Sequence, residues 1–397
     1  EYIERINIFG NNITRESVLR NQFAVDEGDI YNEILLNKSV NNLKSLNFFK
    51  SVDTNVIEGS SPDLKIINIE VDEKPTGEIF AGAGYGTSGG TIGFGIKENN
   101  FMGKGIEFDT NLSVSEEQIR GQFSVYNPNF RGSDNSLSTN IQSLTTDRMT
   151  NYGYKTTKTG FSFGTRFEYY EDLFLSPSTS AFYESLKTTS TASNTLKKQK
   201  GKYFDADIDY MIDLDRRNQK FKTSDGYRSR FFQSLPMISE TNAIINGYEF
   251  NFYEEFLDDV IGSFTFYARA VNSLTNDNVR ISERLFLPSS RLRGFETGKI
   301  GPKDGGDFIG GNYASSINMS TTLPTIFNDL ETLDFKLFFD AANIWGIDYD
   351  SSLDESDKLR SAAGIAVDWY TVVGPLSFSY SLPISKADTD IEENFRF

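Results

Sequence analysis

The amino-acid sequence predicts a mainly β protein, in which an antiparallel transmembrane β-barrel of about sixteen strands follows one small α+β domain. Three observations predict this fold. Apolar and polar residues alternate over most of the chain, as in strands that have two different faces. No apolar stretch reaches the ~18 residues of a transmembrane helix. Aromatic residues, which favour strands and membrane interfaces, are abundant, with 34 Phe and 19 Tyr.

Composition excludes several classes of function. The formal net charge of -17 argues against binding to the phosphate backbone of a nucleic acid. The chain contains no His and no Cys, so it lacks the usual catalytic triads and the usual zinc ligands. We therefore expect no enzyme activity and no catalytic, cofactor-binding or metal-binding residues. Because the chain begins at Glu1 and not at Met, we expect a mature or trimmed segment.

Residues 1–75 are expected to form a small separate domain of the order β-α-α-β-β. Alternation and helix-start signals place its elements at residues 2–8, 15–22, 32–46, 50–57 and 64–71. The longer helix would bury one apolar face, which carries Leu36, Val40, Leu43 and Leu46. Pro75 and Gly77 lie in the expected linker to the barrel.

Residues 76–397 are expected to form the barrel. These residues contain about sixteen alternating runs, with roughly 20 residues for each strand and its connection. Many faces opposite the apolar ones carry charged residues, so a sandwich core could not bury both faces. A wet interior and a lipid exterior account for both, and closure pairs every backbone group. A soluble β-sandwich and a long solenoid are the alternatives, and the even strand count favours the barrel.

The first predicted barrel strand, residues 77–86, is rich in glycine. Gly84–Gly89 formally matches a dinucleotide-binding fingerprint, but the following residues continue as a strand and not as a helix. Gly82, Gly84 and Gly86 share one face, and glycine weakens the packing of a strand. Close approach of a neighbouring loop or strand is an alternative reason for these glycines.

Two groups of carboxylates could carry chemistry. Asp205, Asp207 and Asp209 alternate along one strand, and we interpret them as a wet inner face and not as a catalytic pair. Several acids between Asp348 and Asp357 cluster in a loop where calcium is conceivable. Their spacing fits no EF-hand, so a solvated loop is the favoured interpretation.

A Gly- and Pro-rich loop at residues 284–312 has the tip Arg291-Leu292-Arg293-Gly294-Phe295. Gly294 permits a tight turn, and arginine needs an acidic partner if it is buried. Asp340 lies on the strand face opposite Leu337 and Phe339, so it should point inward. We predict an Arg293–Asp340 ion pair that pins the loop inside the barrel. A mobile surface loop is the alternative.

These motifs resemble the outer-membrane protein assembly (insertase) family. The loop tip is similar to the (V/I)RGF tip of the family's sixth extracellular loop. The segment Leu46–Thr54 is similar to the helix-to-strand corner of a polypeptide-transport-associated (POTRA) domain. Residues near the end of the chain resemble the family's last strands; they are Phe338-Phe339-Asp340, Trp345, Gly364 and Gly374–Tyr380. The resemblance covers essentially the whole chain and implies the last POTRA domain plus the barrel.

One residue departs from the family pattern. Ser320 stands where the family has a second acid facing the loop arginine, which calls that contact into question.

The resemblance implies a function without covalent chemistry, the folding and insertion of other outer-membrane β-barrels. The barrel would lie in the bacterial outer membrane, with the POTRA domain in the periplasm. The implied partners are the lipid bilayer, nascent outer-membrane proteins and accessory periplasmic lipoproteins, and no nucleic acid.

The expected mechanism depends on a weak seam between the first strand, 77–86, and the last, 391–397. The residues that define this seam are Gly77, Gly82, Gly84, Gly86, Ile391, Phe395 and Phe397. A weak seam can open, expose unpaired backbone edges and accept an incoming strand. A short apolar belt there would also thin the bilayer.

Three other functions remain as alternatives. A two-partner-secretion translocator shares the POTRA domain and the RGF loop, and a plug helix would favour it. A passive porin needs no POTRA domain, and a stable conductance would support it. An outer-membrane hydrolase is disfavoured because the chain has no His.

Overall fold

In the computed structural model, the described residues are 1–397 except 87–88, 221, 325–331 and 372–373. Thr87 and Ser88 of the fingerprint-like run therefore lie outside the described residues. Two compact units are made up of residues 1–82, 93–112 and 121–141, and of residues 83–92, 113–120 and 142–397. The domain boundary expected at residue 75 stays a prediction.

The N-terminal residues form a small α+β domain around a three-stranded sheet. The elements in chain order are β1 (Tyr2–Phe9), α1 (Glu16–Arg20), α2 (Glu33–Ser45), β2 (Phe49–Glu58) and β3 (Leu64–Glu73). The sheet order is β1-β3-β2, with β1 parallel and β2 antiparallel to β3. This is the predicted β-α-α-β-β order.

The core of this domain lies between α2 and the sheet. The Asn32 side chain caps α2 by accepting hydrogen bonds from the backbone N–H groups of Ile34 and Leu35. Leu36 and Leu43, seven residues apart on the predicted apolar face, are buried in one cluster with Ile67 of β3. Burial of this face stabilises a helix that would be marginal on its own.

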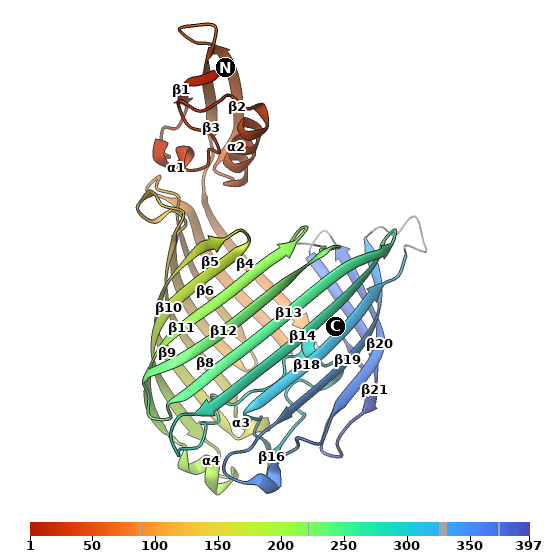
Figure 1. The fold of residues 1–397 in the computed structure, drawn as a ribbon. Coiled ribbons are helices and arrows are strands. Elements are labelled where there is room, and N and C mark those ends of the chain that lie inside the picture. Colours follow the sequence, from red (N-terminus) through yellow and green to blue (C-terminus); the bar gives the residue numbers. More distant parts are fainter. Residues whose placement is uncertain (87–88, 221, 325–331, 372–373) are drawn as a thin grey trace. The chain divides into compact units, whose positions relative to one another are not determined.

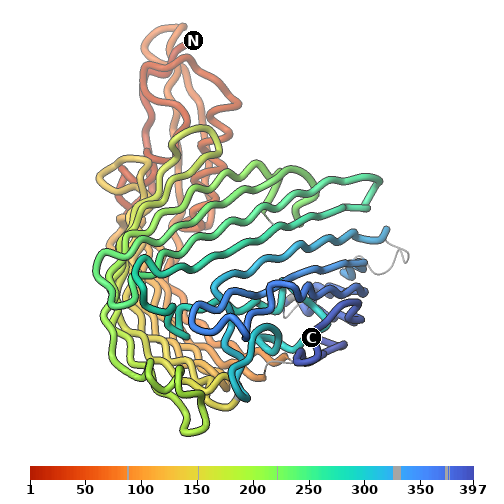
Figure 2. Tube along the Cα trace, turned by 60° about the horizontal axis from the view of Figure 1, so that its bottom comes forward, coloured from red at the N-terminus to blue at the C-terminus, as the bar shows by residue number. Residues whose placement is uncertain are grey.

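The remaining large element is a single antiparallel sheet of sixteen strands that curls into a nearly closed barrel. Figure 2 shows its strands following one another around the sheet in sequence order, from orange to blue. Its strands are β4 (Gly77–Gly86), β5 (Gly89–Phe101), β6 (Ile106–Ser115), β7 (Gln118–Asn127), β8 (Ser136–Arg148), β9 (Tyr154–Tyr170), β10 (Leu173–Thr188), β11 (Gly201–Arg217), β12 (Gly226–Ile238), β13 (Ala243–Leu257), β14 (Val260–Ser273), β18 (Tyr313–Thr322), β19 (Leu333–Trp345), β20 (Arg360–Thr371), β21 (Gly374–Ser385) and β23 (Phe395–Arg396). The predicted fold class is therefore confirmed. Within the described residues, every helix is too short or too polar to span a membrane.

The two faces of the sheet differ as the alternation predicts. On β11, Phe204 and Ile208 are exposed on the outer face, whereas Asp205 and Asp213 are buried on the inner face. Cross-strand partners preserve this division, because Asp213 lies opposite Arg230 and Phe204 lies opposite Tyr183. The inner face is therefore a polar surface that the chain itself covers in part.

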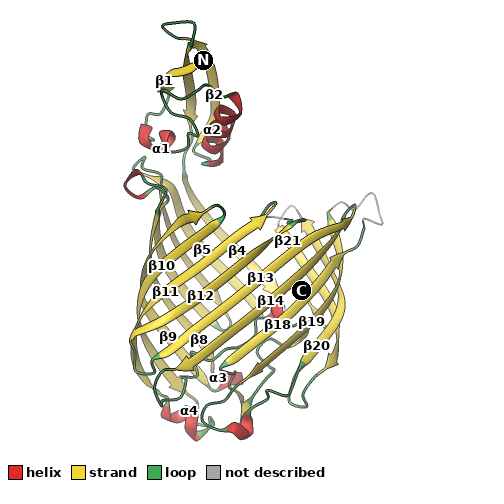
Figure 3. Ribbon diagram, viewed as in Figure 1, coloured by secondary structure: helices red, strands yellow, loops and turns green. Residues whose placement is uncertain are grey.

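Short helices and a long loop gather at one end of the strands (Figures 1 and 3). The long loop, residues 274–312, joins β14 to β18. We call this end of the sheet, where β14 ends and β18 begins, the loop end. The short elements in the connections are η1 (Phe130–Gly132), α3 (Met149–Tyr152), α4 (Asn194–Lys198), η2 (Ser289–Arg291), β15 (Gly294–Phe295), β16 (Lys303–Asp304), β17 (Asp307–Phe308), η3 (Ser351–Leu353) and β22 (Glu392–Glu393).

Candidate functional site

The long loop packs its apolar residues against the inner face of the sheet. Leu292 and Phe295 are buried, and they belong to one cluster with Ala314, Ala342 and Ala362 of three successive strands. Alanine at these wall positions leaves room for the larger loop side chains. The loop tip is therefore part of a hydrophobic core and is not a free surface turn.

The loop tip is fixed by Arg293, which forms a two-pronged ion pair with Asp340 of β19. Arg293 Nε and Nη2 each donate to a different carboxylate oxygen of Asp340 at 2.7 Å, and the Arg293 backbone N–H donates at 3.1 Å. The Asp340 side chain is fully buried. The guanidinium also lies 3.4 Å from the centre of the Phe338 ring. This geometry uses one edge of the planar cation for the carboxylate and one face for the ring.

Asn318 of β18 completes the site, and sequence reasoning missed it. Its side-chain amide donates to Asp340 Oδ1 at 2.8 Å and to the Arg291 carbonyl at 2.9 Å. The Ser320 hydroxyl, two residues farther along β18, instead lies 2.7 Å from the Ser263 hydroxyl. Strand parity contained the signal, because Asn318 lies directly opposite Asp340 in the β18–β19 register.

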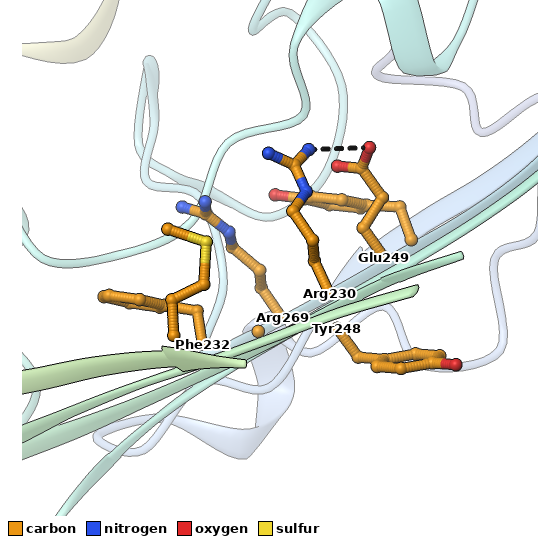
Figure 4. Close-up of a pocket in the computed structure, with 8 residues that line it drawn as sticks. Arg230, Phe232, Tyr248, Glu249 and Arg269 are labelled. Atoms are coloured by element: carbon orange, nitrogen blue, oxygen red, sulfur yellow. Dashed lines mark hydrogen bonds and ion pairs between the residues drawn. The ribbon is translucent and has the colours of Figure 1, made fainter. Parts of the chain in front are cut away.

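Arg291 reaches the neighbouring part of the wall. Its Nη2 donates to Glu249 Oε2 at 2.8 Å, and the other oxygen of Glu249 accepts from Arg230 at 3.0 Å. Arg230 and Glu249 border a cavity of about 260 Å³. Figure 4 shows Phe232 and Arg269 on the same side of the sheet as this pair, whereas Tyr248 points to the other side.

A second anchor holds the start of the long loop. Arg280 is 1% exposed and is surrounded by three acids: Nη2 contacts Asp205 at 2.6 Å and Glu283 at 3.0 Å, and Nε lies 3.3 Å from Glu184. Its guanidinium also lies over the ring of Tyr203. Burial raises the pKa of the Glu283 carboxyl. The wet inner face expected at Asp205 is therefore wrong for this residue, because the loop covers it.

The acidic loop after β19 also contacts the long loop, through Asp348. Asp348 pairs with Arg284 and accepts the backbone N–H of Val279 at 2.6 Å. Asp354 accepts the backbone N–H of Gly346 at 2.6 Å. In the described part of the chain, no group of acids is arranged to hold a metal ion.

The loop tip pairs with the C-terminal segment. Gly294 and Phe295 form a short antiparallel ladder, β15–β22, with residues 392–393. The Glu296 N–H donates to the Ile391 carbonyl at 2.9 Å, and the Ile391 N–H donates to the Lys299 carbonyl at 3.0 Å. The loop tip therefore connects the wall, through Asp340, to the end of the chain.

Two arginines secure the same C-terminal segment. Arg360 of β20 is fully buried and makes two bonds of 2.9 Å to Asp390. Arg396 donates to the Phe295 carbonyl at 2.9 Å and pairs with Glu393. The segment before β23 is thus held inside the barrel by side chains as well as by backbone.

The seam lies between β4 and β23, which are the two ends of the large sheet. Of the expected last strand, residues 391–397, β23 in the large sheet comprises two residues, Phe395 and Arg396. The expected longer strand is wrong because residues 392–393 pair with the loop tip. The rings of Tyr85 and Phe397 lie 6.0 Å apart, so the edges approach each other at the end of β4.

The seam glycines differ in their surroundings. A Cβ at Gly82 or Gly84 would meet no atom within 4 Å, whereas one at Gly77 would lie 3.1 Å from a Glu98 carboxylate oxygen. At Gly86 a Cβ would lie 2.8 Å from the Phe397 carbonyl oxygen. Close approach therefore explains Gly86 but not Gly82 or Gly84.

Two family models match the chain. Residues 100–397 match the Omp85 superfamily domain, and residues 1–74 match a POTRA model described as a surface antigen variable number repeat. Together these two matches cover both the small domain and almost all of the barrel.

Similar proteins fall into the same group. The outer membrane protein assembly factor BamA of Nitratidesulfovibrio vulgaris is 24% identical over 406 residues, covering 100% of this chain and 50% of the relative. The human sorting and assembly machinery component 50 homolog is 22% identical over 275 residues, covering 66% of this chain and 58% of the human protein. The chain spans about half the length of the first curated relatives that it matches.

Solved structures share the fold. The crystal structure of BamA from Haemophilus ducreyi lacking POTRA domains 1–3 matches with a TM-score of 0.88 at 24% identity, covering 100% of this chain and 83% of that one. CdiB from Acinetobacter baumannii matches with a TM-score of 0.54 at 12% identity, covering 100% and 72%.

Proposed function

The chain belongs to the Omp85 superfamily, and on that premise we propose that it folds and inserts other β-barrel proteins into the bacterial outer membrane. The names of the bacterial relatives as outer membrane protein assembly factors support this proposal. The POTRA domain would lie in the periplasm, where it would meet client chains and accessory lipoproteins. No covalent step is involved.

The observation that carries the proposal is the difference in length between the two strands at the seam. β4 has ten residues, nearly all of them exposed, whereas β23 has two. A two-residue strand cannot pair with the whole backbone edge of β4. The unmatched N–H and C=O groups of β4 would be available to an incoming strand, which would add to that edge by β-augmentation.

The long loop supports this arrangement by holding the C-terminal segment away from the seam. Residues 392–393 bond to the loop tip, and Arg293 ties the tip to Asp340. As long as these contacts persist, the chain before β23 is not free to extend the last strand. The anchored loop would therefore keep the seam short and ready to open.

A crosslink across the seam tests the proposal. The chain has no native cysteine, so Tyr85→Cys with Phe397→Cys can be joined by a short thiol crosslinker without side reactions. We expect the crosslinked protein to lose the assembly of client barrels into vesicles, and to regain it on cleavage of the link.

The matched control joins two strands away from the seam. Val367→Cys with Phe378→Cys lie directly opposite each other on β20 and β21. This crosslink should leave client assembly unchanged. Full assembly by the seam-crosslinked protein would refute the gate mechanism. A steady conductance without client assembly would favour a passive porin.

A further inference from the structure

Five exposed lysines surround the connection between β10 and β11 at the loop end of the barrel. They are Lys187, Lys197, Lys198, Lys200 and Lys202. Within the described residues, none of these five forms an ion pair with a carboxylate. This is unexpected in a chain with a net charge of -17, in which acids outnumber bases. Unpaired like charges repel one another, so a counter-charge would stabilise the cluster.

The register places two of these lysines, Lys187 and Lys202, at the outer face. Lys202 lies opposite Ser185, and Tyr183 lies opposite Phe204, one alternate position closer to the middle of the strands. Lys187 continues the same outer face of β10. The exposed aromatic rings of Tyr183 and Phe204 would contact lipid chains, and the lysines begin about 7 Å farther along. Cations at this height would meet lipid head groups.

A neighbouring lysine extends the cluster onto a third strand. Lys155 of β9 lies directly opposite Lys187 and is paired with Asp147 at 2.8 Å. Directly opposed like charges are unfavourable in a sheet. Asp147 offsets the charge of Lys155, whereas Lys187 has no such acid. An external anion could therefore neutralise Lys187 as Asp147 neutralises Lys155.

The connection that carries the lysines is ordered by buried contacts. Leu196 of α4 is 1% exposed and packs in a cluster with Ile281 and Ile309 of the long loop. Gln199 accepts the backbone N–H of Ile281 at 2.8 Å, and its carbonyl accepts the Tyr203 hydroxyl at 2.5 Å. Lys198 and Lys200, on either side of Gln199, therefore start from a fixed backbone. Binding of an anion by these lysines would therefore cost less conformational entropy than binding by lysines on a flexible loop.

We propose that Lys187, Lys200 and Lys202 form a binding site for the phosphate groups of membrane lipids at the loop end of the barrel. This inference rests on the proposed location in an outer membrane but not on the assembly activity. Each lysine near an anionic surface strengthens binding roughly five-fold before screening by salt. Three lysines together should therefore have a measurable effect.

The test compares two triple variants of the full chain in zwitterionic nanodiscs. One variant carries Lys187→Gln, Lys200→Gln and Lys202→Gln. The control carries Lys38→Gln, Lys44→Gln and Lys220→Gln, which remove the same charge from exposed positions elsewhere. The probe is a fluorescent bisphosphorylated glycolipid, compared with its dephosphorylated form. We expect the first variant to bind the phosphorylated probe at least about 10-fold more weakly, and the control to bind as the wild type does.

The remaining arms identify the source of the phosphate and separate this inference from the proposed function. Excess inorganic phosphate should compete poorly, because it lacks the acyl chains that enter the bilayer. Equal binding of probe by the wild type and the first variant, or by the phosphorylated and dephosphorylated probes, would overturn the lipid site, as would full competition by inorganic phosphate. Client assembly by the wild type is measured in zwitterionic vesicles. Its absence there would count against the proposed function and would leave the lipid result unaffected.

Discussion

The wall that faces the long loop and the seam between β4 and β23 are built in opposite ways. The inner wall of the barrel presents two buried acids, Asp340 and Asp205, and each pairs with an arginine of the loop. Asp340 also accepts a hydrogen bond from the amide of Asn318 on β18. The seam presents exposed glycines with empty space around Gly82 and Gly84, and a last strand of two residues. Both regions belong to the same antiparallel sheet.

The difference shows where this barrel concentrates its stabilising contacts. Buried charges are costly to separate, so the loop is held to the wall by contacts that break together. The last strand offers two residues for backbone pairing at the seam, so the opening that we propose there would disrupt few bonds. One barrel can then be stable as a whole and weak along one line.

The largest expected effect comes from Asp340→Ala. This change leaves the Arg293 guanidinium and the Asn318 amide without their shared partner in a buried site. We expect a loss of about 3–5 kcal/mol in the free energy of unfolding, measured by urea titration in detergent micelles. Ser320→Ala, on the neighbouring strand, is the control and should cost at most about 1 kcal/mol. Equal losses of unfolding free energy for the two changes would show that the contact with the loop does not make Asp340 more important than another residue of the inner face.

Arg280→Met should have the next largest effect, because three carboxylates then face one another without a cation. Protonation of Glu283 can relieve part of this repulsion, so we expect a cost of about 2–4 kcal/mol. Arg216→Met is the matched control, since its pair with Asp172 is about half exposed and is worth at most about 1 kcal/mol. The same titration measures both. A cost for Arg280→Met no larger than that of the control would show that the second anchor adds nothing.

Gly294→Ala tests the geometry of the loop tip. Gly294 has φ +89°, and an added Cβ would lie 3.1 Å from the Ala362 Cβ. We expect a cost of about 1–3 kcal/mol and faster exchange of the β15–β22 amides. Gly305→Ala is the control, because its φ is +65° but open space surrounds it. The excess over the control measures the contact with the wall. No excess would mean that the tip can shift freely.

The smallest effect concerns pH. Burial raises the pKa of Glu283, so the folded state binds a proton more readily than the unfolded chain does. Stability should therefore rise as the pH falls through the raised pKa toward the ordinary value of about 4.5. Glu283→Gln should remove this contribution, which we expect to be within about 1–2 kcal/mol. Urea titrations of both proteins across this pH range would show it. A steeper rise of stability with falling pH in Glu283→Gln would contradict the assignment of this pH dependence to Glu283.

The strand pattern was sufficient to predict the sixteen-stranded fold and the small domain, because two-residue periodicity and the α2 apolar face are local signals. Strand parity also assigned Asp340 to the inner face, and the loop motif singled out Arg293. The structure brings these two side chains together, and their functional role stays a proposal.

Two of the contacts that escaped prediction join distant segments. Arg280 reaches Asp205 across 75 positions, and the loop tip reaches residues 392–393 across about a hundred. Nothing in the local pattern of residues 391–397 indicates that this run would split between a ladder with the loop and a short edge strand. Such choices depend on which partner lies nearby in the folded chain, and a one-dimensional periodicity does not contain that information.

Amide hydrogen exchange of the whole chain in micelles tests the central claim most directly, by comparing the peptide of residues 77–86 with that of residues 243–257. Both are strands of the same sheet, but β13 has a paired strand on each side. We predict that the amides of β4 exchange at least about 10-fold faster, while those of Glu296 and Ile391 at the loop tip stay protected. Equal protection of β4 and β13, together with rapid exchange at the loop tip, would contradict the account of a weak seam beside an anchored loop.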